Sequence, residues 1–340
     1  MDFLGMKILL TGGCGFIGST ILDRYLAEGH DVTVIDNFRS GRLENVSHNL
    51  GHGKLTIIPG SILDKGFLSS LGTDFDIINH HAAQLEITRC MDFPEEDINS
   101  NVIGTVNVFE LAKRCKGLRK VIYASSAAVY GQAKSPLQKE TDPIDPHWIY
   151  GVSKYSTEMF AKIYSDSLKI PFYGIRYSIV YGKREWFGRV LTLFVKNSIE
   201  EKRIVVFGKG DEVRDYVNVR DAAEANVLML ERGPSGGSHA YNISSGRGIT
   251  VANLAGKISS LSGCEIIEED VEEGASSKIL NKGRVRLPGN LAYLCQDNSK
   301  ASGDFGWSPK VGFDEGLKEE FQWYSEGRKR DKGLWARMFY

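Results

Sequence analysis

Three glycines near the N-terminus have a spacing that suits a bound phosphate group. Gly12, Gly15 and Gly18 follow an apolar run at residues 6–10 and open an amphipathic segment at residues 16–28. A tight strand-to-helix turn needs a residue that tolerates positive φ, and a turn without side chains lets a pyrophosphate reach the N–H groups at the helix start. The pattern therefore predicts a dinucleotide-binding turn rather than a glycine-rich turn that only packs a helix on a sheet.

A carboxylate stands where such a fold holds the adenosine ribose. Asp36 ends the next β-rich run, residues 31–35, at 18 residues beyond Gly18. A carboxylate at the end of this strand hydrogen-bonds the ribose hydroxyls, which favours NAD over NADP.

Tyr150 and Lys154 form the second pair that could do chemistry. They are four residues apart within a helical pattern, so they share one helix face. An ammonium group beside a phenol favours the phenolate, and we expect Lys154 to lower the pKa of Tyr150. A tyrosine tuned in this way can exchange a hydroxyl proton at neutral pH. The same spacing occurs as a surface pair on ordinary helices, so its weight comes from the dinucleotide turn upstream.

A serine completes the set of candidate catalytic residues. Ser126 follows the apolar strand at residues 121–123. Hydroxyl groups at the carboxyl end of a parallel strand face the crevice where ligands bind, so Ser126 could hydrogen-bond the reacting oxygen. The alternative is a serine-rich turn without a chemical role.

Composition excludes several classes of function. The net charge of −1 over 340 residues gives no broad basic field for nucleic acid or an acidic membrane. No apolar run approaches the roughly 20 residues that span a bilayer, and the early first strand leaves no room for a signal peptide. The five cysteines are widely spaced and lack a C-x-x-C pair, which indicates reduced thiols in a cytoplasmic protein and no metal site.

Short β-rich runs alternate with helical patterns in the first half of the chain. This alternation predicts βαβ units and an α/β fold, a Rossmann-type doubly wound parallel sheet with a smaller C-terminal α/β substrate lobe. We expect residues 1–178 to form the NAD-binding domain and residues 179–340 mainly the substrate lobe, with some segments returning to the sheet. The predicted strands are 7–10, 31–35, 55–58, 75–79, 120–124, 172–177, 204–206 and 240–243, and the predicted helices are 16–28, 63–71, 96–115, 150–168, 190–201, 220–231 and 314–326. Residues 265–273 and 274–286 are expected to form mobile loops.

Several further motifs occur in order along nearly the whole chain. They are Asn-His-His-Ala-Ala at 79–83, Asn-Val-Ile-Gly-Thr at 101–105, Arg-Tyr-Ser-Ile-Val-Tyr-Gly at 176–182 and the Arg-Asp-Tyr-Val-Asn-Val-Arg-Asp run at 214–221. With the glycine turn, Asp36 and the Tyr150/Lys154 pair, they resemble the extended short-chain dehydrogenase/reductases, specifically the sugar-nucleotide epimerase/dehydratase family.

The resemblance implies a role for each matching residue. Tyr150 would be the acid/base, Lys154 its partner and Ser126 a proton shuttle, while Arg214 would neutralise the diphosphate of a nucleotide sugar. The implied cofactor-binding residues are Gly12, Gly15, Phe16, Ile17, Gly18, Asp36, Asn37, Ser61, Ile62, His80, Ala82, Asn101, Ser125, Tyr150 and Lys154. The implied substrate-binding residues are Glu86, Ser126, Tyr150, Arg189, Val190, Arg214 and Arg286. Two alternatives stay open: Asn101 could bond a loop, and Arg214 could pair with Asp215 or Asp211.

The chain departs from the family pattern at several positions. Ser61 stands where an aspartate that contacts adenine is common, and Ile179 replaces an asparagine that contacts the substrate. Glu86 and Arg89, with Trp186 and Arg189, would give the sugar pocket an unusual character, consistent with an amide, amine or carboxylate on the substrate. The alternative is that these are surface and packing residues.

The residues after Ser126 bear on the reaction. Dehydratases of the family usually have an Asp-Glu pair there, and decarboxylases a glutamate at the second position, whereas this chain has Ala127 and Ala128. Alanine cannot move a proton, so the pattern favours a 4-epimerase acting on a nucleotide sugar, with a UDP-sugar as the expected substrate. The alternatives are a dehydratase or reductase of the same family and a non-catalytic NAD-binding regulator. The resemblance also implies a homodimer paired through helices 96–115 and 150–168.

Overall fold

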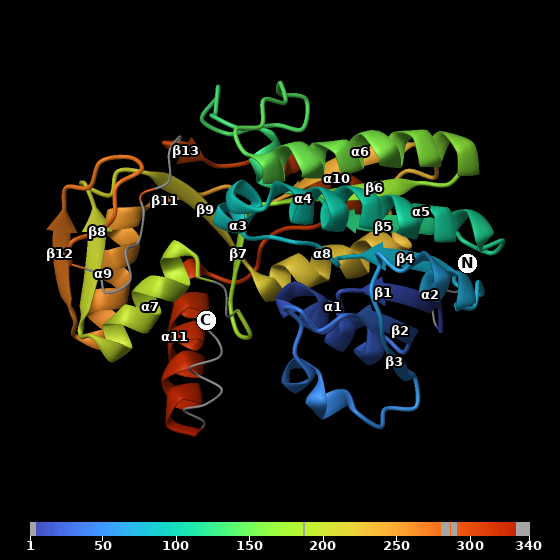
Figure 1. The fold of residues 1–340 in the computed structure, drawn as a ribbon, viewed down its shortest axis with the longest axis horizontal. Coiled ribbons are helices and arrows are strands. Elements are labelled where there is room, and N and C mark those ends of the chain that lie inside the picture. Colours follow the sequence, from blue (N-terminus) through green and yellow to red (C-terminus); the bar gives the residue numbers. More distant parts are fainter. Residues whose placement is uncertain (1–4, 186–187, 280–285, 287–290, 331–340) are drawn as a thin grey trace.

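The computed structural model describes residues 5–185, 188–279, 286 and 291–330, and Figure 1 shows their arrangement. In this part of the chain, a seven-stranded sheet has the strand order β10-β6-β5-β4-β1-β2-β3. Every neighbouring pair in it is parallel. The sheet comprises β1 (Lys7–Thr11), β2 (Asp31–Asp36), β3 (Leu55–Pro59), β4 (Ile77–His80), β5 (Lys120–Ala124), β6 (Phe172–Tyr177) and β10 (Ser238–Ile243).

Helices cover both faces of the sheet because its strands are apolar on both sides. In β1, Ile8 and Leu10 lie in the core beneath α1 and α8, whereas Leu9 lies in the opposite core beneath α5 and α6. This alternation confirms the predicted doubly wound parallel sheet. The helices around it are α1 (Phe16–Ala27), α2 (Lys65–Ser70), α3 (Ile87–Asp92), α4 (Pro94–Asp97), α5 (Gly104–Arg114), α6 (Ile149–Leu168), α8 (Val219–Glu231) and α10 (Ser299–Phe305).

A smaller lobe with its own core lies beyond one end of the sheet (Figure 1). Its strands are β7 (Ile179–Tyr181), β8 (Arg203–Phe207), β9 (Val213–Asn218), β11 (Gly248–Thr250), β12 (Glu265–Glu269) and β13 (Tyr293–Leu294). Its helices are α7 (Val190–Glu200), α9 (Val251–Ser262) and α11 (Phe313–Arg330). The chain enters this lobe after β6 but returns to the first lobe with α8, β10 and α10, whose side chains join the core beneath α1.

One prediction of secondary structure is wrong in an informative way. The acidic segment expected as a loop at 265–273 begins with β12, which pairs in parallel with β8. Among the described strands β12 has β8 as its one neighbour, so Glu265 and Glu268 are exposed and conceal the strand pattern. The helix expected at 96–115 runs without a break from α4 through a π-helical segment at Ile98–Ile103 into α5.

The core beneath α5 and α6 is built around one aromatic ring. Phe109 is fully buried, and its ring lies 5.2 Å from that of Phe172 and 5.9 Å from that of Tyr123, measured between centroids. These contacts join α5 to two strands of the sheet. Edge-to-face packing of this kind adds to the free energy gained from burial of the rings.

Replacing Phe109 by alanine should therefore leave a cavity between α5 and the sheet. We expect the free energy of unfolding to fall by about 3–5 kcal/mol in urea titrations. Leu50→Ala is the control, because Leu50 is an exposed apolar side chain and its truncation should change stability by less than about 0.5 kcal/mol. Equal stability of the two variants would contradict this assignment of the core.

Candidate active site

The glycine turn joins β1 to α1 and leaves no space for side chains. Gly12 has φ +72°, and a Cβ there would lie 2.7 Å from the backbone nitrogen of Ala82. A Cβ on Gly18 would lie 2.1 Å from the carbonyl oxygen of Gly12. The first turn of α1, which contains Phe16 and Ile17, has no acidic residue. The helix N-terminus is thus closely approachable and carries no competing negative charge, which fits the pyrophosphate of a dinucleotide.

Asp36 is held firmly beside this turn. Its carboxylate, at the carboxyl end of β2, accepts hydrogen bonds from the backbone nitrogens of Cys14 at 3.0 Å and Phe38 at 2.8 Å. Burial raises the pKa of Asp36, and these two bonds oppose the increase. Gly41 makes room for the carboxylate, since a Cβ there would lie 2.5 Å from its Oδ1. The neighbouring Asn37 is exposed and accepts a bond from the Arg39 nitrogen.

The turns after β3 and β4 contain three further residues that are expected to bind the cofactor: Ser61, Ile62 and Ala82. Ser61 is half-buried, and its hydroxyl accepts a hydrogen bond from the Leu63 nitrogen at 3.2 Å. The Ile62 carbonyl accepts one from the Asn107 side chain at 3.0 Å, which docks this turn onto α5. The Ala82 nitrogen donates to the Thr11 hydroxyl at 3.2 Å, close to the Gly12 turn.

His80 is a core residue. Its Nδ1 lies 2.7 Å from the Thr11 hydroxyl and its Nε2 lies 3.0 Å from that of Thr105. Burial lowers the pKa of His80 to about 3, so the ring is neutral. Because both ring nitrogens bond to protein hydroxyls, His80 can line the cofactor through its backbone and ring surface but not through a ring hydrogen bond.

Asn101 does what the alternative interpretation predicted and bonds a loop. Its side chain exchanges two hydrogen bonds with the Gln84 backbone, at 2.8 and 2.9 Å, and donates to Asp97 at 2.6 Å. Its carbonyl lies in the π-helical segment and accepts bonds from the hydroxyls of Thr105 and Thr157. Asn101 thus ties the loop after β4 to α6 instead of presenting its amide to a ligand.

Tyr150, Lys154 and Ser126 come together where β5 ends against α6. The Tyr150 phenol hydrogen-bonds the Ser126 side chain. The Ser126 hydroxyl also accepts a bond from the Ala128 nitrogen at 3.1 Å, which fixes its direction. Lys154 Nζ lies 5.8 Å from the centroid of the Tyr150 ring and donates to the Ala124 carbonyl at 3.0 Å.

The predicted effect of Lys154 on Tyr150 is wrong for the protein alone. Burial raises the pKa of Tyr150 to about 12, and the opposing contributions come from the Ser126 bond and the charge of Arg189. Burial also lowers the pKa of Lys154 to about 8, against the raising effect of the buried Asp97 carboxylate. The four-residue spacing places both side chains on one helix face, but the Lys154 ammonium group approaches the Tyr150 ring and donates to the Ala124 carbonyl.

Ser125 belongs to a structural network that sequence reasoning missed. Its hydroxyl donates to Glu158 at 2.5 Å, and Glu158 forms a buried ion pair with Arg176 at 2.7 Å. The ion pair joins α6 to β6 directly beneath the Ser126 turn. The signal was present in the sequence, because Glu158 lies four residues after Lys154 on the same helix.

The expected substrate residues are distributed around the loop after β4 and the smaller lobe. Glu86 precedes α3 and is half-buried, but Arg89 forms two bonds to Glu96, at 2.7 and 2.9 Å. A neighbouring carboxylate thus holds the Arg89 guanidinium, as the alternative interpretation of a surface residue expects.

Arg189 precedes α7, which starts at Val190, and it binds Glu185 through Nε at 2.9 Å. Arg286 pairs with Glu212 at 3.3 Å, and Arg214 Nη1 donates to the Val213 carbonyl at 2.8 Å. Asp215 is bonded by the Ser245 nitrogen and hydroxyl. Trp186 lies outside the described residues.

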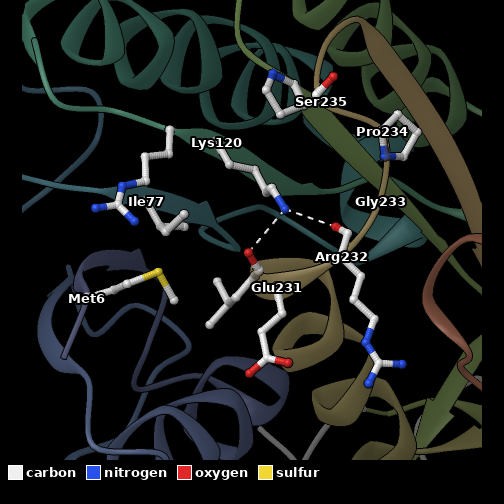
Figure 2. A pocket seen from close by; sticks show the side chains of 11 residues that line it. Met6, Ile77, Lys120, Glu231, Arg232, Gly233, Pro234 and Ser235 are labelled. Atoms are coloured by element: carbon white, nitrogen blue, oxygen red, sulfur yellow. Dashed lines mark hydrogen bonds between the residues drawn. The ribbon is translucent and has the colours of Figure 1, made fainter. Parts of the chain in front are cut away.

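A cavity of about 750 Å³ lies at the amino ends of the strands, away from this site (Figure 2). Lys120 extends into it and donates to the Leu230 and Arg232 carbonyls at the end of α8. Burial lowers the pKa of Lys120 to about 8. Its ammonium group caps a helix C-terminus, which explains its burial.

Two other kinds of site find no support in the described ranges. No group of three or more histidine, cysteine and carboxylate side chains is arranged to hold a metal ion among the residues described. Within the same residues, every helix is too short or too polar to cross a bilayer.

Comparison with known proteins identifies the family. Residues 9–320 match the family described as GDP-mannose 4,6 dehydratase. A UDP-glucose 4-epimerase of Mycolicibacterium smegmatis is 32% identical over 325 residues, covering 94% of this chain and 98% of that protein. The chain therefore belongs to the NAD-dependent sugar-nucleotide epimerases and dehydratases of the extended short-chain dehydrogenase/reductase class.

Solved structures support the same assignment. The Thermotoga maritima UDP-glucose 4-epimerase with UDP-glucose has a TM-score of 0.82 and 31% identity, covering 94% of this chain and 99% of that one. A Streptomyces venezuelae dTDP-glucose 4,6-dehydratase with NAD bound has a TM-score of 0.87 and 26% identity, covering 98% and 100%. NAD is accordingly the cofactor of this chain, as predicted. These proteins differ in reaction, so the likeness does not decide among activities.

The closed geometry of the glycine turn predicts the effect of one added methyl group. In Gly18→Ala, the new Cβ would have to displace α1 from the Gly12 carbonyl, so we expect NAD affinity to fall at least about tenfold, equivalent to about 1.4 kcal/mol, in calorimetric titrations. Gly256→Ala is the control, because a Cβ on that helical glycine meets nothing within 4 Å. Unchanged NAD affinity in Gly18→Ala would contradict this account of the turn.

Proposed function

We propose that this protein is an NAD-dependent 4-epimerase of a nucleotide sugar, in the first instance a UDP-sugar. One observation carries the proposal. The Tyr150–Ser126 pair is followed by Ala127 and Ala128, which are both buried and bring no proton donor to the site. A site with one acid/base can move a proton on and off a single oxygen, which is all that epimerisation requires besides hydride transfer.

The proposed mechanism assigns one task to each residue. NAD, held by the glycine turn and Asp36, would supply the hydride acceptor and donor for C4 of the sugar. Tyr150 removes the C4 hydroxyl proton and restores it to the same oxygen. Ser126 orients the Tyr150 hydroxyl, since the Ala128 nitrogen fixes the direction of its own oxygen. Arg214 and Arg286 are proposed to bind the diphosphate, which suits planar guanidinium donors.

A dehydratase or reductase of the same family is the second candidate, and the structural likeness to a dTDP-glucose 4,6-dehydratase supports it. Epimerisation leaves the mass of the sugar nucleotide unchanged, dehydration removes one water, and reduction consumes reduced cofactor. Mass spectrometry after incubation with UDP-, dTDP-, GDP- and CDP-sugars separates these outcomes. Retained NAD without turnover of any of them would favour a non-catalytic regulator.

Removal of the phenol oxygen should stop the reaction without releasing the cofactor. In Tyr150→Phe we expect kcat to fall by at least about 10²–10⁴-fold, the contribution of a positioned acid/base, while NAD stays bound. Tyr155→Phe makes the same change on the same helix and should keep near-normal turnover. Near-normal turnover of Tyr150→Phe in a coupled assay would end the assignment.

We propose that the chain forms a homodimer through α5 and α6. Exposed apolar side chains gather on α6 and on the π-helical segment that precedes α5, which is unusual for a surface in contact with water. They are Ile98, Ile103, Val152, Met159 and Ile163. Two aromatic residues of these helices belong to the core instead: Phe109 is fully buried and Phe160 packs against its cluster.

A charge on this apolar face should dissociate the dimer. Ile163 is 62% exposed and is the most accessible of the five side chains. We expect Ile163→Glu to be a monomer by light scattering at micromolar concentration, and Leu50→Glu, a matched change elsewhere on the surface, to remain a dimer. A wild-type monomer, or a dimeric Ile163→Glu, would contradict the proposal.

We also propose that the protein acts in the cytoplasm. Its five cysteines are all buried and none forms a disulfide with another. Burial raises the pKa of the Cys14 thiol in the glycine turn to about 12, which keeps it unreactive.

A further inference from the structure

Two buried glutamates meet where α11 packs against the loop after β7. Glu185 is 1% exposed and Glu320 is fully buried, and each carboxyl group acts on the pKa of the other at hydrogen-bonding range. Among the described residues, Glu185 Oε2 and both carboxyl oxygens of Glu320 have no conventional donor. Two ionised carboxylates have no proton to place between them, so this contact requires one of the two groups to be protonated.

The surroundings indicate which carboxyl carries the proton. Glu185 Oε1 accepts two hydrogen bonds from Arg189, through Nε at 2.9 Å and Nη2 at 2.5 Å, as an ionised partner does. Glu320 faces the charged Glu185, and burial together with that charge raises its pKa further than burial alone. The Glu320 hydroxyl is therefore placed to donate to Glu185 Oε2, the oxygen that lacks another donor. The other titratable groups that face the pair are Tyr181, Arg189, Tyr216 and Tyr324.

The pair is connected to the catalytic phenol through Arg189. This arginine stands at the start of α7, donates to the Val180 carbonyl at 2.8 Å, and lowers the pKa of Tyr150 through its charge. A side chain of the small lobe thus acts on the acid/base of the large lobe. The orientation of the Arg189 guanidinium depends on Glu185 Oε1, and the other oxygen of Glu185 faces Glu320.

We propose that Glu320 is a positioning residue, which shares one proton with Glu185 so that a singly charged carboxyl pair holds Arg189, whose charge acts on Tyr150, at the start of α7. The role in catalysis rests on the proposed function, whereas the shared proton rests on the geometry of the pair. A second negative charge in this enclosed space would compete for the same guanidinium and repel Glu185. A neutral donor at position 320 satisfies Glu185 without that repulsion.

Four variants test the shared proton. Glu320→Gln keeps a neutral hydrogen-bond donor at every pH, Glu320→Leu removes the donor, and Glu185→Gln removes the charge that holds Arg189. Glu319→Gln is the matched control, because Glu319 is the preceding residue on α11 and pairs with Arg220 instead.

The first measurement is the pH dependence of thermal unfolding, which needs no substrate. The pKa of Glu320 in the folded protein lies above its unfolded value of about 4.3, so folding takes up a proton between the two values. Stability from this group is present below the unfolded pKa and is lost as pH rises toward the folded pKa. We expect Tm of the wild type and of Glu319→Gln to fall relative to Glu320→Gln as pH rises from about 4. Equal pH slopes for the wild type and Glu320→Gln would overturn the shared proton.

The second measurement is the acid limb of kcat/KM against pH, which reports deprotonation of Tyr150. Displacement of the Arg189 guanidinium from its position raises the pKa of Tyr150, so this limb should move to higher pH in Glu320→Leu and Glu185→Gln. Glu320→Gln should restore the wild-type position, and Glu319→Gln should not move it. Equal limbs in Glu320→Gln and Glu320→Leu would overturn the positioning role. A wild type without turnover on any sugar nucleotide would refute the proposed function and this role, while the first measurement would still decide the shared proton.

Discussion

The central constraint of this structure is a phenol that must give up a proton although protein atoms surround much of it. Tyr150 is half-buried, and desolvation of its hydroxyl moves its pKa to about 12, away from neutrality. Such desolvation makes the phenolate costly. The surrounding charges and hydrogen bonds therefore matter more than the phenol itself. The Ser126 bond and the Arg189 charge both act toward the ionised form.

The fold provides these groups from separate elements that meet at one edge of the parallel sheet. β1 and β2 end at the glycine turn and Asp36, and β5 ends just before Ser126. The buried Arg176–Glu158 pair fixes α6, which carries Tyr150 and Lys154, against β6. Asn101 attaches the loop after β4 to the π-helical segment. Each group is thus held by bonds that do not depend on a ligand, which is how a preorganised site is built.

Local patterns in the sequence were sufficient for the dinucleotide half of the site. Gly12, Gly18 and Asp36 are specified by a turn and by strand ends, and both features lie within a short stretch of chain. The spacing of Tyr150 and Lys154 predicted that the two side chains share a helix face. It did not predict how far the Tyr150 hydroxyl is removed from solvent, and that desolvation decides the direction of its pKa shift. Glu320 gave no signal, because its partner Glu185 lies in another element far along the chain. β12 was missed because its exposed glutamates resemble a charged loop.

The most direct test of the account follows the hydrogen at C4 of the sugar. Purified protein would be incubated with UDP-glucose deuterated at C4, and the products analysed by mass spectrometry and NMR. We predict a C4 epimer of unchanged mass that keeps its deuterium at C4, because the hydride removed is the hydride returned. Deuterium at C6 with loss of water, or exchange of the label with solvent, would contradict the central claim.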